Sequence, residues 1–424
     1  MTITAEGITK TFGATLTAVD GLSLSIRQGT FTALVGPDGA GKTTLMRMLA
    51  GLLKPDSGSL HVLGIDVARD PQAVQDRISY MPQRFGLYED LSVQENLDLY
   101  ADLHGVPMDE RRVRFTRMLE MTDMARFTAR PAGKLSGGMK QKLGLACTLV
   151  RLPDLLLLDE PSVGVDPLSR RDLWQIVEQL VRDEGLSVIV STSYMDEAER
   201  CAQVCVMNKG RLLAEGTPDA LRARARGLTF TATTPAKMPA RALQARLIDR
   251  ADLIVDAVPQ GGNVRFIRQP GAKLDDLMGD IPITPRPEEL EDAFMLLLHQ
   301  HEGGAPSAVP EPNLKPAPAE VGPAIVVRDL VRKFGDFTAV ASTSFDVARG
   351  EIFGLLGPNG AGKTTTFRML CGLLPATSGE LKVAGRDLRH ARARARGRIG
   401  YVAQKFALYG NLTVRENLQF FGGA

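Results

Sequence analysis

A nine-residue glycine-rich segment that occurs twice constrains this chain more than any other feature. The first copy, GPDGAGKTT, follows the apolar run Phe31 to Val35 and precedes TLMRMLAGLL, whose apolar spacing predicts a helix. Strand, glycine loop and helix in this order are typical of a phosphate-binding loop, the Walker A motif, whose backbone N–H groups surround phosphate oxygens. Lys42 is expected to bridge the β- and γ-phosphates and Thr43 to help hold Mg²⁺, whereas Asp38 is expected to point outward and cap the loop. The nucleotide-binding residues predicted here are Gly36, Pro37, Asp38, Gly39, Ala40, Gly41, Lys42, Thr43 and Thr44.

The second copy, GPNGAGKTT, follows the apolar run Ile352 to Leu356, which we expect to be the corresponding strand. Lys363 lies 321 residues after Lys42, and Gln404 lies 321 residues after Gln83. A constant offset over such a distance indicates a duplicated domain. The residues expected to bind a second nucleotide are Gly357, Pro358, Asn359, Gly360, Ala361, Gly362, Lys363, Thr364, Thr365 and Gln404, with Thr364 and Gln404 also directed at a metal ion.

Composition limits the number of domains, the kinds of partner and the presence of disulfides or membrane spans that this chain can have. The 424 residues are too many for one compact domain, and the net charge of +2 gives no general attraction to nucleic acid or acidic membranes. The four cysteines do not form a disulfide framework, so we expect buried, reduced thiols. The start lacks the apolar core of a signal peptide, and no apolar run approaches the length of about 18 residues that a membrane span needs. If this chain acts on a membrane, it does so through partner subunits.

Acidic and amide residues complete a candidate hydrolytic site. DLLLLDEP places Asp159 and Glu160 at the end of an apolar strand, which is the Walker B pattern. Asp159 is expected to bind Mg²⁺ through water, and Glu160 to act as general base toward the attacking water. Gln83 follows the strand-like ISYMP, where an amide can contact Mg²⁺ and orient the same water. The alternative, two exposed acids at a strand end, is weakened by the upstream phosphate loop.

Two further features concern the nucleotide. Ser136, Gly137 and Gly138 open a helix and make a second anion-binding helix start. The phosphates at Lys42 already have a binding loop, so we expect these three residues to face a nucleotide that is held by another domain. Phe12 ends an alternating strand, and its ring either stacks on adenine or packs in the core; the sequence leaves both open, as it does for Phe334.

These motifs together resemble one family. Residues 1 to about 220 are similar to an ATP-binding cassette (ABC) nucleotide-binding domain in the phosphate loop, Gln83, LSGGM (Leu135 to Met139), Asp159, Glu160 and the loop to Asp166. The amino-acid sequences of these segments resemble those of the tandem ATPase subunits of bacterial drug-efflux exporters. The resemblance implies an α/β P-loop NTPase with a RecA-like core, an antiparallel β subdomain and an α-helical signature subdomain, duplicated, with the second copy incomplete. It also implies an ATPase that uses ATP and Mg²⁺.

The resemblance also implies partners and a location. Two cassettes of this family pair head to tail, and each ATP lies between the Walker motifs of one and the signature of the other. Partners would be the transmembrane permease subunits of a multidrug or ion exporter, reached from the cytoplasmic face of the plasma membrane, with no nucleic acid. The alternative is a soluble tandem ATPase acting on ribosomes or nucleic acid. That class usually joins its cassettes by a long charged helical segment, whereas here a small mixed domain and a Pro-rich linker lie between them.

One position departs from the family pattern. The family has a histidine after the last strand, where it contacts the γ-phosphate, and this chain has Ser193. A serine can hydrogen-bond but cannot carry positive charge. The resemblance therefore gives Glu160, Gln83 and Ser193 as the catalytic set and predicts slow turnover at the Lys42 site.

The predicted organisation has four parts: a first cassette (1–222), a small α+β accessory domain (223–299), a Pro/Ala-rich linker (300–323) and the start of a second cassette (324–424). In the accessory domain, TFTATT and NVRFIR read as strands and RPEELEDAFMLLLH as an amphipathic helix. Drug-export ATPases carry a similar appendage with a Leu-Glu-Asp-x-Phe helix, here Leu290 to Phe294, which we interpret as a packing helix. The basic run Arg389 to Arg398 is expected to be solvated.

The second cassette segment is short. The offset of 321 places the counterpart of Asp159 at position 480, beyond residue 424, and no second signature is present. We therefore expect a fragment or truncated product, in which the Lys363 site has no Walker B acids of its own. Such a chain is expected to bind Mg-ATP at the first domain and to hydrolyse it poorly.

Overall fold

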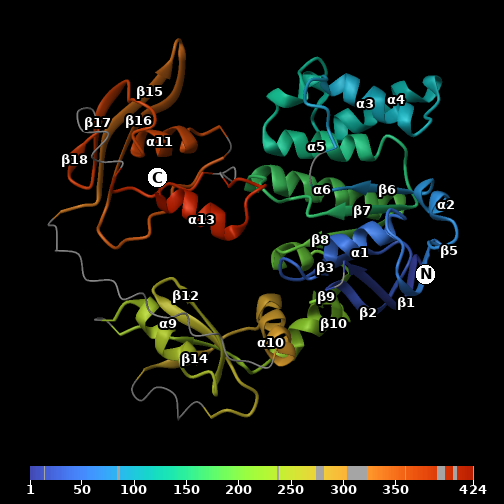
Figure 1. Ribbon diagram of the computed structural model, residues 1–424, viewed down its shortest axis with the longest axis horizontal. Helices are drawn as coiled ribbons and strands as arrows, with labels where there is room; N and C mark the ends of the chain where they lie inside the picture. Colours follow the sequence, from blue (N-terminus) through green and yellow to red (C-terminus); the bar gives the residue numbers. More distant parts are fainter. Residues whose placement is uncertain are drawn as a thin grey trace. The chain divides into compact units, whose positions relative to one another are not determined.

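The computed structural model describes residues 1–13, 15–83, 86–235, 238–273, 281–302, 322–358, 360–388, 397–403 and 408–423. Asn359, Gln404, most of the linker and most of the basic run at 389–398 lie outside these residues. The chain forms two compact units, Met1–Pro310 and Glu311–Ala424 (Figure 1).

A six-stranded sheet forms the centre of the first unit, in the order β10-β9-β3-β8-β7-β6. All neighbours pair in parallel except β10 with β9. The four leucines of β7 serve both faces, because Leu155 and Leu157 join one apolar cluster and Leu156 and Leu158 the other. The strands are β3 (Phe31–Val35), β6 (Ile78–Met81), β7 (Leu155–Asp159), β8 (Ser187–Thr192), β9 (Gln203–Asn208) and β10 (Arg211–Gly216).

A second, antiparallel sheet covers one side of helix α1 (Lys42–Leu49). Its order is β2-β1-β4-β5, from β1 (Ile3–Phe12), β2 (Leu16–Ile26), β4 (Ser57–Val62) and β5 (Ile65–Asp66). Leu45, Met46 and Leu49 of α1 are fully buried in the cluster that joins the two sheets. The helix that follows the phosphate loop is therefore fixed on both sides by apolar contacts. The short helix α2 (Pro71–Gln75) follows.

Helices build the signature subdomain and the region after it. They are α3 (Val93–Leu103), α4 (Met108–Met121), α5 (Gly137–Thr148), α6 (Pro167–Glu184) and α7 (Met195–Ala198), with 3-10 turns at Ala125–Phe127 and Ala132–Lys134. The predicted α/β cassette with a β subdomain and a helical signature subdomain is confirmed. All four cysteines are buried and free, as expected, and burial raises the pKa of the thiols of Cys147, Cys201 and Cys205.

The accessory region has the two predicted strands, β11 and β13, and the predicted helix, which begins at Leu290 and not at Arg286. Its sheet, in the order β12-β13-β11-β14, is antiparallel throughout. Its elements are α8 (Pro218–Arg222), a 3-10 turn (Ala223–Ala225), β11 (Thr229–Ala232), α9 (Ala240–Ile248), β12 (Ile254–Gln260), β13 (Asn263–Arg268), β14 (Ile283–Pro285) and α10 (Leu290–Glu302). Leu290, Phe294 and Leu297 of α10 pack on the apolar core of the cassette, so this helix has the packing role that we inferred from its sequence.

The second unit repeats the β subdomain. The order β16-β15-β17-β18 matches β2-β1-β4-β5, and Ile325 pairs with Val347 and Val383 as Ile3 pairs with Ile26 and Val62. The elements are β15 (Ile325–Phe334), β16 (Phe337–Val347), α11 (Lys363–Leu370), β17 (Ser378–Val383), β18 (Arg386–Asp387) and α13 (Val414–Gly423).

Our prediction of a strand at Ile352 to Leu356 is wrong, because these residues form no strand. Its counterpart β3 lies between the parallel strands β8 and β9. The described residues of the second unit include no parallel strand that could pair with this segment. Without such neighbours the apolar residues stay in solvent, and Ile352 and Leu356 are 98% and 93% exposed.

Candidate nucleotide-binding site

The first phosphate loop lies between the end of β3 and the start of α1. Gly41 caps α1 with φ 97°, and the helix begins at Lys42. The Nζ atom of Lys42 donates hydrogen bonds to the carbonyl oxygens of Gly36 (2.7 Å) and Pro37 (3.1 Å), and it lies 3.5 Å from Oε1 of Glu160. Because the Lys42 side chain is only 5% exposed, its positive charge is held inside the loop. In this position the charge can pair with the oxygens of a bound phosphate chain.

Two glycines of the loop are required by the protein's own backbone. A Cβ atom on Gly36 would lie 2.3 Å from the carbonyl oxygen of Met207, and one on Gly41 would lie 2.2 Å from that of Ala18. Gly39 has open space around it and a φ of +79°. Close packing therefore accounts for Gly36 and Gly41, and backbone conformation accounts for Gly39.

Other members of the loop differ in accessibility. Ala40 is buried, whereas Asp38 is exposed. The outward direction that we predicted for Asp38 is confirmed. Its capping role stays a prediction.

The Walker B acids lie beside the loop, as predicted. Asp159 is the last residue of β7, and its Oδ1 accepts a hydrogen bond from Oγ1 of Thr43 (3.2 Å). Gln83 donates from Nε2 to Oε2 of Glu160 (2.7 Å). Glu160 has a φ of 49°, a left-handed conformation that is costly for a non-glycine residue and typical of functional positions. The structure therefore brings Lys42, Thr43, Gln83, Asp159 and Glu160 together at the carboxyl edge of the parallel sheet.

Ser191 is a site residue that the sequence reasoning missed. It is completely buried, and its hydroxyl donates to Oδ1 of Asp159 (2.5 Å) and accepts from the amide of Glu160 (3.0 Å). The parallel register of β7 and β8 pairs Asp159 with Ser191 and so makes this contact. The available signal was a hydroxyl near the end of an apolar strand, which becomes informative only once the two strands are known to be neighbours.

Tyr80 also contacts the Walker B acid. Its hydroxyl donates to Oδ2 of Asp159 over 3.2 Å. Burial, followed by the charge of Asp159, raises the pKa of Tyr80 to about 12. Tyr80 is therefore a permanent hydrogen-bond donor near neutral pH, and with Thr43 and Ser191 it surrounds the Asp159 carboxylate with hydroxyl donors.

Ser193 directly follows β8 and is exposed. The residues around it are fixed: Thr192 donates to Oε2 of the fully buried Glu197 (2.6 Å) and accepts from the amide of Tyr194 (3.0 Å). Arg170 of α6 forms an ion pair with Glu197 at 3.5 Å and lies over the Tyr194 ring. Thr192 pairs with Val35, the residue before the phosphate loop, so Ser193 stands at the same edge of the sheet.

The signature residues open α5 as predicted. Ser136 is the N-cap and accepts a hydrogen bond from the amide of Met139 (3.3 Å). Gly138 is required, since a Cβ atom there would lie 2.3 Å from Oγ of Ser169, whose amide and hydroxyl both bind Asp166. Ser136 is exposed and Gly137 is half-buried, so this helix start is accessible from outside the unit.

The structure excludes a core position for the Phe12 ring, which was one of the two alternatives. Its ring is 41% exposed and that of Phe334 is 46% exposed, so neither is a core residue. Each lies beside a cation, Lys10 at 5.9 Å and Arg332 at 4.4 Å. Both rings are therefore accessible for stacking.

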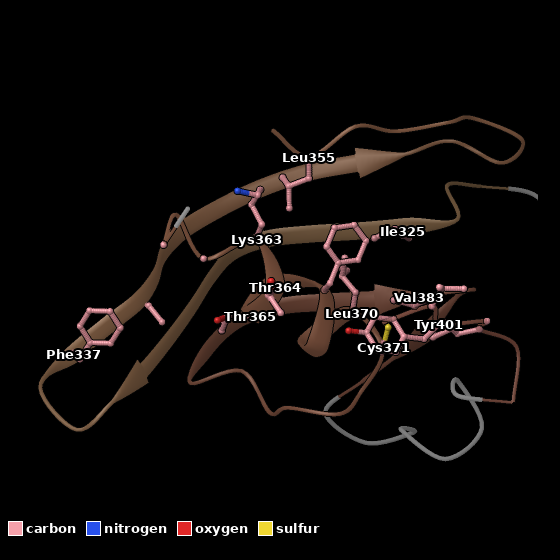
Figure 2. Close-up of a pocket in the computed structure, with 17 residues that line it drawn as sticks. Ile325, Phe337, Leu355, Lys363, Thr364, Thr365, Leu370, Cys371, Val383 and Tyr401 are labelled. Atoms are coloured by element: carbon pink, nitrogen blue, oxygen red, sulfur yellow. The ribbon is translucent and has the colours of Figure 1, made fainter. Parts of the chain in front are cut away.

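The second phosphate loop repeats the lysine and glycine contacts of the first. Lys363 donates to the carbonyl oxygens of Gly357 and Pro358, and a Cβ atom on Gly362 would lie 2.4 Å from the carbonyl oxygen of Ala339, the counterpart of Ala18. The loop opens onto a cavity of about 840 Å³, and Figure 2 shows Lys363, Thr364 and Thr365 among its lining residues. Gly360 and Ala361 are exposed.

The donor atoms at the first site suit a hard divalent cation. The hydroxyl of Thr43, the carboxylate of Asp159 and the amide of Gln83 supply oxygen ligands of the kind that Mg²⁺ prefers. No group of three or more His, Cys, Asp or Glu residues that could hold a metal occurs within the described part of the chain.

A strand–loop–helix with a buried lysine, next to two acids at a parallel sheet edge, defines a P-loop nucleotide-binding protein. The profile of the ABC transporter family matches residues 19–163 and 340–422, more than half of the chain. The chain belongs to the ABC transporter family, as an ATP-binding protein.

Two relatives illustrate the match. The chain is 52% identical over 432 residues to "Probable multidrug ABC transporter ATP-binding protein YbhF" of Escherichia coli (strain K12), covering 99% of this chain and 73% of the relative. It is 41% identical over 226 residues to "Daunorubicin resistance ATP-binding protein DrrA3" of Streptomyces coeruleorubidus, covering 53% of this chain and 71% of the relative.

Proposed function

We propose that this chain is the ATP-hydrolysing subunit of an exporter that moves small organic molecules through separate membrane-spanning partner subunits. The observation that carries the proposal is the grouping of Lys42, Gln83, Asp159 and Glu160 at one sheet edge. The names of the relatives, which mention multidrug transport and daunorubicin resistance, support the export of organic compounds. None of the described helices is long and apolar enough to cross a bilayer. Partner subunits would supply the membrane passage and place this chain on the cytoplasmic face of the plasma membrane.

The first site suggests a role for each residue. The loop amides bind the β- and γ-phosphates, and the Lys42 ammonium exchanges the Gly36 and Pro37 carbonyls for phosphate oxygens. Glu160 accepts a proton from the attacking water, and Gln83, already bonded to Glu160, orients that water. Thr43, Asp159 and Gln83 would hold Mg²⁺, which when bound neutralises charge on the phosphates. Phe12 would stack on the adenine.

The signature and the second cassette extend this proposal. Ser136 is exposed and Gly137 is half-buried, and with Gly138 they would close over a nucleotide held by another cassette. We propose that this chain by itself binds Mg-ATP at Lys42 and hydrolyses it slowly, because Ser193 offers no positive charge to the γ-phosphate. We also propose the division into a cassette (1–222), an accessory domain (223–299), a linker (300–323) and a second cassette segment (324–424).

Ser193 is proposed as a brake on turnover. A serine at this position can offer a hydrogen bond but no positive charge to the γ-phosphate, and removing one transition-state contact typically costs about 10²–10³ in rate. Ser193→His is expected to raise the turnover number at least tenfold, whereas the control Ser193→Ala should leave it nearly unchanged. Equal rates for both variants and the parent would show that Ser193 is not the brake.

The proposal as a whole is tested by isolating the chain with its membrane partners. Drug-stimulated ATP hydrolysis that Lys42→Ala abolishes would support it. Association with ribosomes or RNA that weakens as salt is raised, with no membrane partner recovered, would instead support the alternative class of soluble tandem ATPase.

A further inference from the structure

A cavity of about 450 Å³ lies in the first unit between the accessory sheet and helix α10, away from the phosphate loop. Its size is in the range of pockets for small organic ligands. One wall is a single face of α10, with Met295, Leu298, His299 and Glu302 at the i, i+3, i+4 and i+7 spacing. The opposite face of the same helix packs on the cassette core through Leu290, Phe294 and Leu297. An occupant of the cavity would therefore touch a helix whose other face packs on the cassette core.

A β-bulge builds the other wall. Three consecutive residues of the edge strand β12, Ile254, Val255 and Asp256, all line the cavity. A regular strand would direct alternate side chains to opposite faces. The pairing of β12 with β13 is irregular here, because Ile254 pairs with Arg268 and Asp256 with Ile267, which leaves Val255 as the extra residue. Such a bulge turns side chains toward a common side.

The lining is apolar around one unpaired charge. Ile248, Val255, Met295 and Leu298 each remain partly accessible, so they form an apolar surface that a ligand can cover. At the mouth, Lys209 and Glu302 neutralise each other at 2.8 Å, and Asn208 also binds Glu302. Among the charged lining residues that the structure describes, Asp256 is the one without an ion pair.

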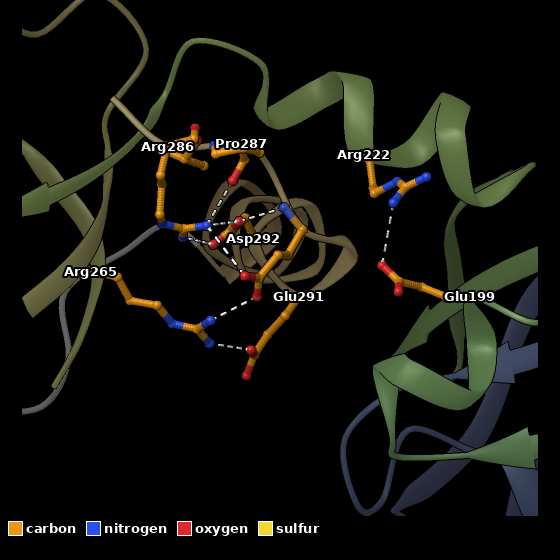
Figure 3. A network of polar contacts seen from close by, with 9 residues as sticks. Glu199, Arg222, Arg265, Arg286, Pro287, Glu291 and Asp292 are labelled. Carbon is orange, nitrogen blue, oxygen red and sulfur yellow. Dashed lines mark hydrogen bonds and ion pairs between the residues drawn. The ribbon is translucent and has the colours of Figure 1, made fainter. Parts of the chain in front are cut away.

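The surroundings of Asp256 keep it unneutralised. Burial raises the pKa of Asp256, the Ala257 amide and the charge of Arg265 lower it, and the charges of Glu291 and Asp292 raise it. Arg265 forms no ion pair with Asp256, because it is bound to Glu289 and Glu291, as Figure 3 shows for Arg265 and Glu291. A half-buried carboxylate of this kind is stabilised by a cation that enters the cavity.

We propose that this cavity is a binding site for a small organic monocation with an apolar body, whose charge pairs with Asp256 and whose body covers Val255, Met295 and Leu298. The site is separate from the nucleotide site and does not depend on the proposed transport role. Its contact with α10 gives such a ligand a direct connection to the cassette core.

The test uses two ions of nearly the same shape and opposite charge, tetraphenylphosphonium and tetraphenylborate, titrated calorimetrically into the full chain at pH 7. Asp256→Asn is compared with the control Asp252→Asn, which removes a nearby exposed acid that pairs with Arg250 and does not line the cavity. The comparison between variants removes any binding to apolar surface of the second unit, because that surface is the same in both.

Asp256→Asn is expected to weaken phosphonium binding at least tenfold and to leave borate binding no weaker, while Asp252→Asn binds both ions as the parent does. Unchanged phosphonium affinity in Asp256→Asn would overturn the proposal. An equal loss for both ions would overturn it too, because it would indicate a change of cavity shape and not the loss of a charge partner.

Discussion

Replacing Ser191 by alanine removes the hydroxyl that joins the two Walker B acids. The fully buried Ser191 hydroxyl donates a hydrogen bond to Asp159 (2.5 Å) and accepts one from the Glu160 amide (3.0 Å). The Glu160 amide keeps a second acceptor, the Ser191 carbonyl at 3.1 Å, so the main loss is the bond to the Asp159 carboxylate. Hydrogen bonds to charged groups contribute about 1.5–3 kcal/mol, so we expect the free energy of unfolding to fall by about 2 kcal/mol.

The same bond orients the carboxylate that we assign to Mg²⁺. Loss of such supporting contacts typically costs about 10–100-fold in metal affinity, so Ser191→Ala should weaken Mg-ATP binding at least about tenfold. Binding of ATP in the presence of EDTA should change little, because it depends on the loop and Lys42. Nucleotide affinity is measured by calorimetry. Urea unfolding is followed by the fluorescence of Trp174, which is the chain's single tryptophan and is buried in the first cassette.

Ser187→Ala is the matched control. Ser187 is a buried serine of the same strand, and its hydroxyl accepts from the amide of Gly29 (2.9 Å), away from the acids. It should lose stability as Ser191→Ala does but keep the parent affinity for Mg-ATP. The reasoning is refuted if Ser191→Ala keeps the full Mg²⁺ dependence of ATP binding, or if the control loses it equally.

Three further outcomes follow from the structure. Gly41→Ala should cost at least about 3 kcal/mol in the Trp174 assay, because a left-handed backbone and a clash at 2.2 Å combine, whereas Gly39→Ala, with open space, should cost only about 1–2 kcal/mol. Burial raises the pKa of both Tyr80 and Tyr100 to about 12, so in an alkaline absorbance titration Tyr80→Phe should reduce the step near pH 12 by one of these two tyrosines. The raised pKa contributes stability that is present below pH 10 and is lost as pH rises through about 12. Asp292→Asn should destabilise the accessory region by about 3 kcal/mol, seen as faster amide hydrogen exchange, because it removes the buried carboxylate that pairs with Arg286 and leaves only Glu289 at 3.9 Å.

The sequence was sufficient where function depends on local order along the chain. Lys42 and Thr43 belong to one contiguous motif, and Asp159 with Glu160 closes one apolar strand, so each was predicted from its own segment. Ser191 was not, because its role depends on which strand lies next to β7 and on their register.

Tertiary environment decided the remaining cases. The exposure of Phe12 depends on the β1–β2 hairpin and could not be read from alternation alone. The run Ile352 to Leu356 has the composition of a buried strand but lacks parallel neighbours in its unit, so the prediction failed. The cavity at Asp256 depends on a bulge that places consecutive residues on one side, which periodicity cannot reveal.

Binding of labelled ATP to the full chain, measured by equilibrium dialysis with and without Mg²⁺, tests the account most directly. Three proteins are compared: the parent, Lys42→Ala and Lys363→Ala. We expect one Mg²⁺-dependent site that is lost in Lys42→Ala and kept in Lys363→Ala, since only the first loop has Asp159 and Glu160 beside it. Undiminished Mg-ATP binding in a folded Lys42→Ala protein would contradict the assignment of the site.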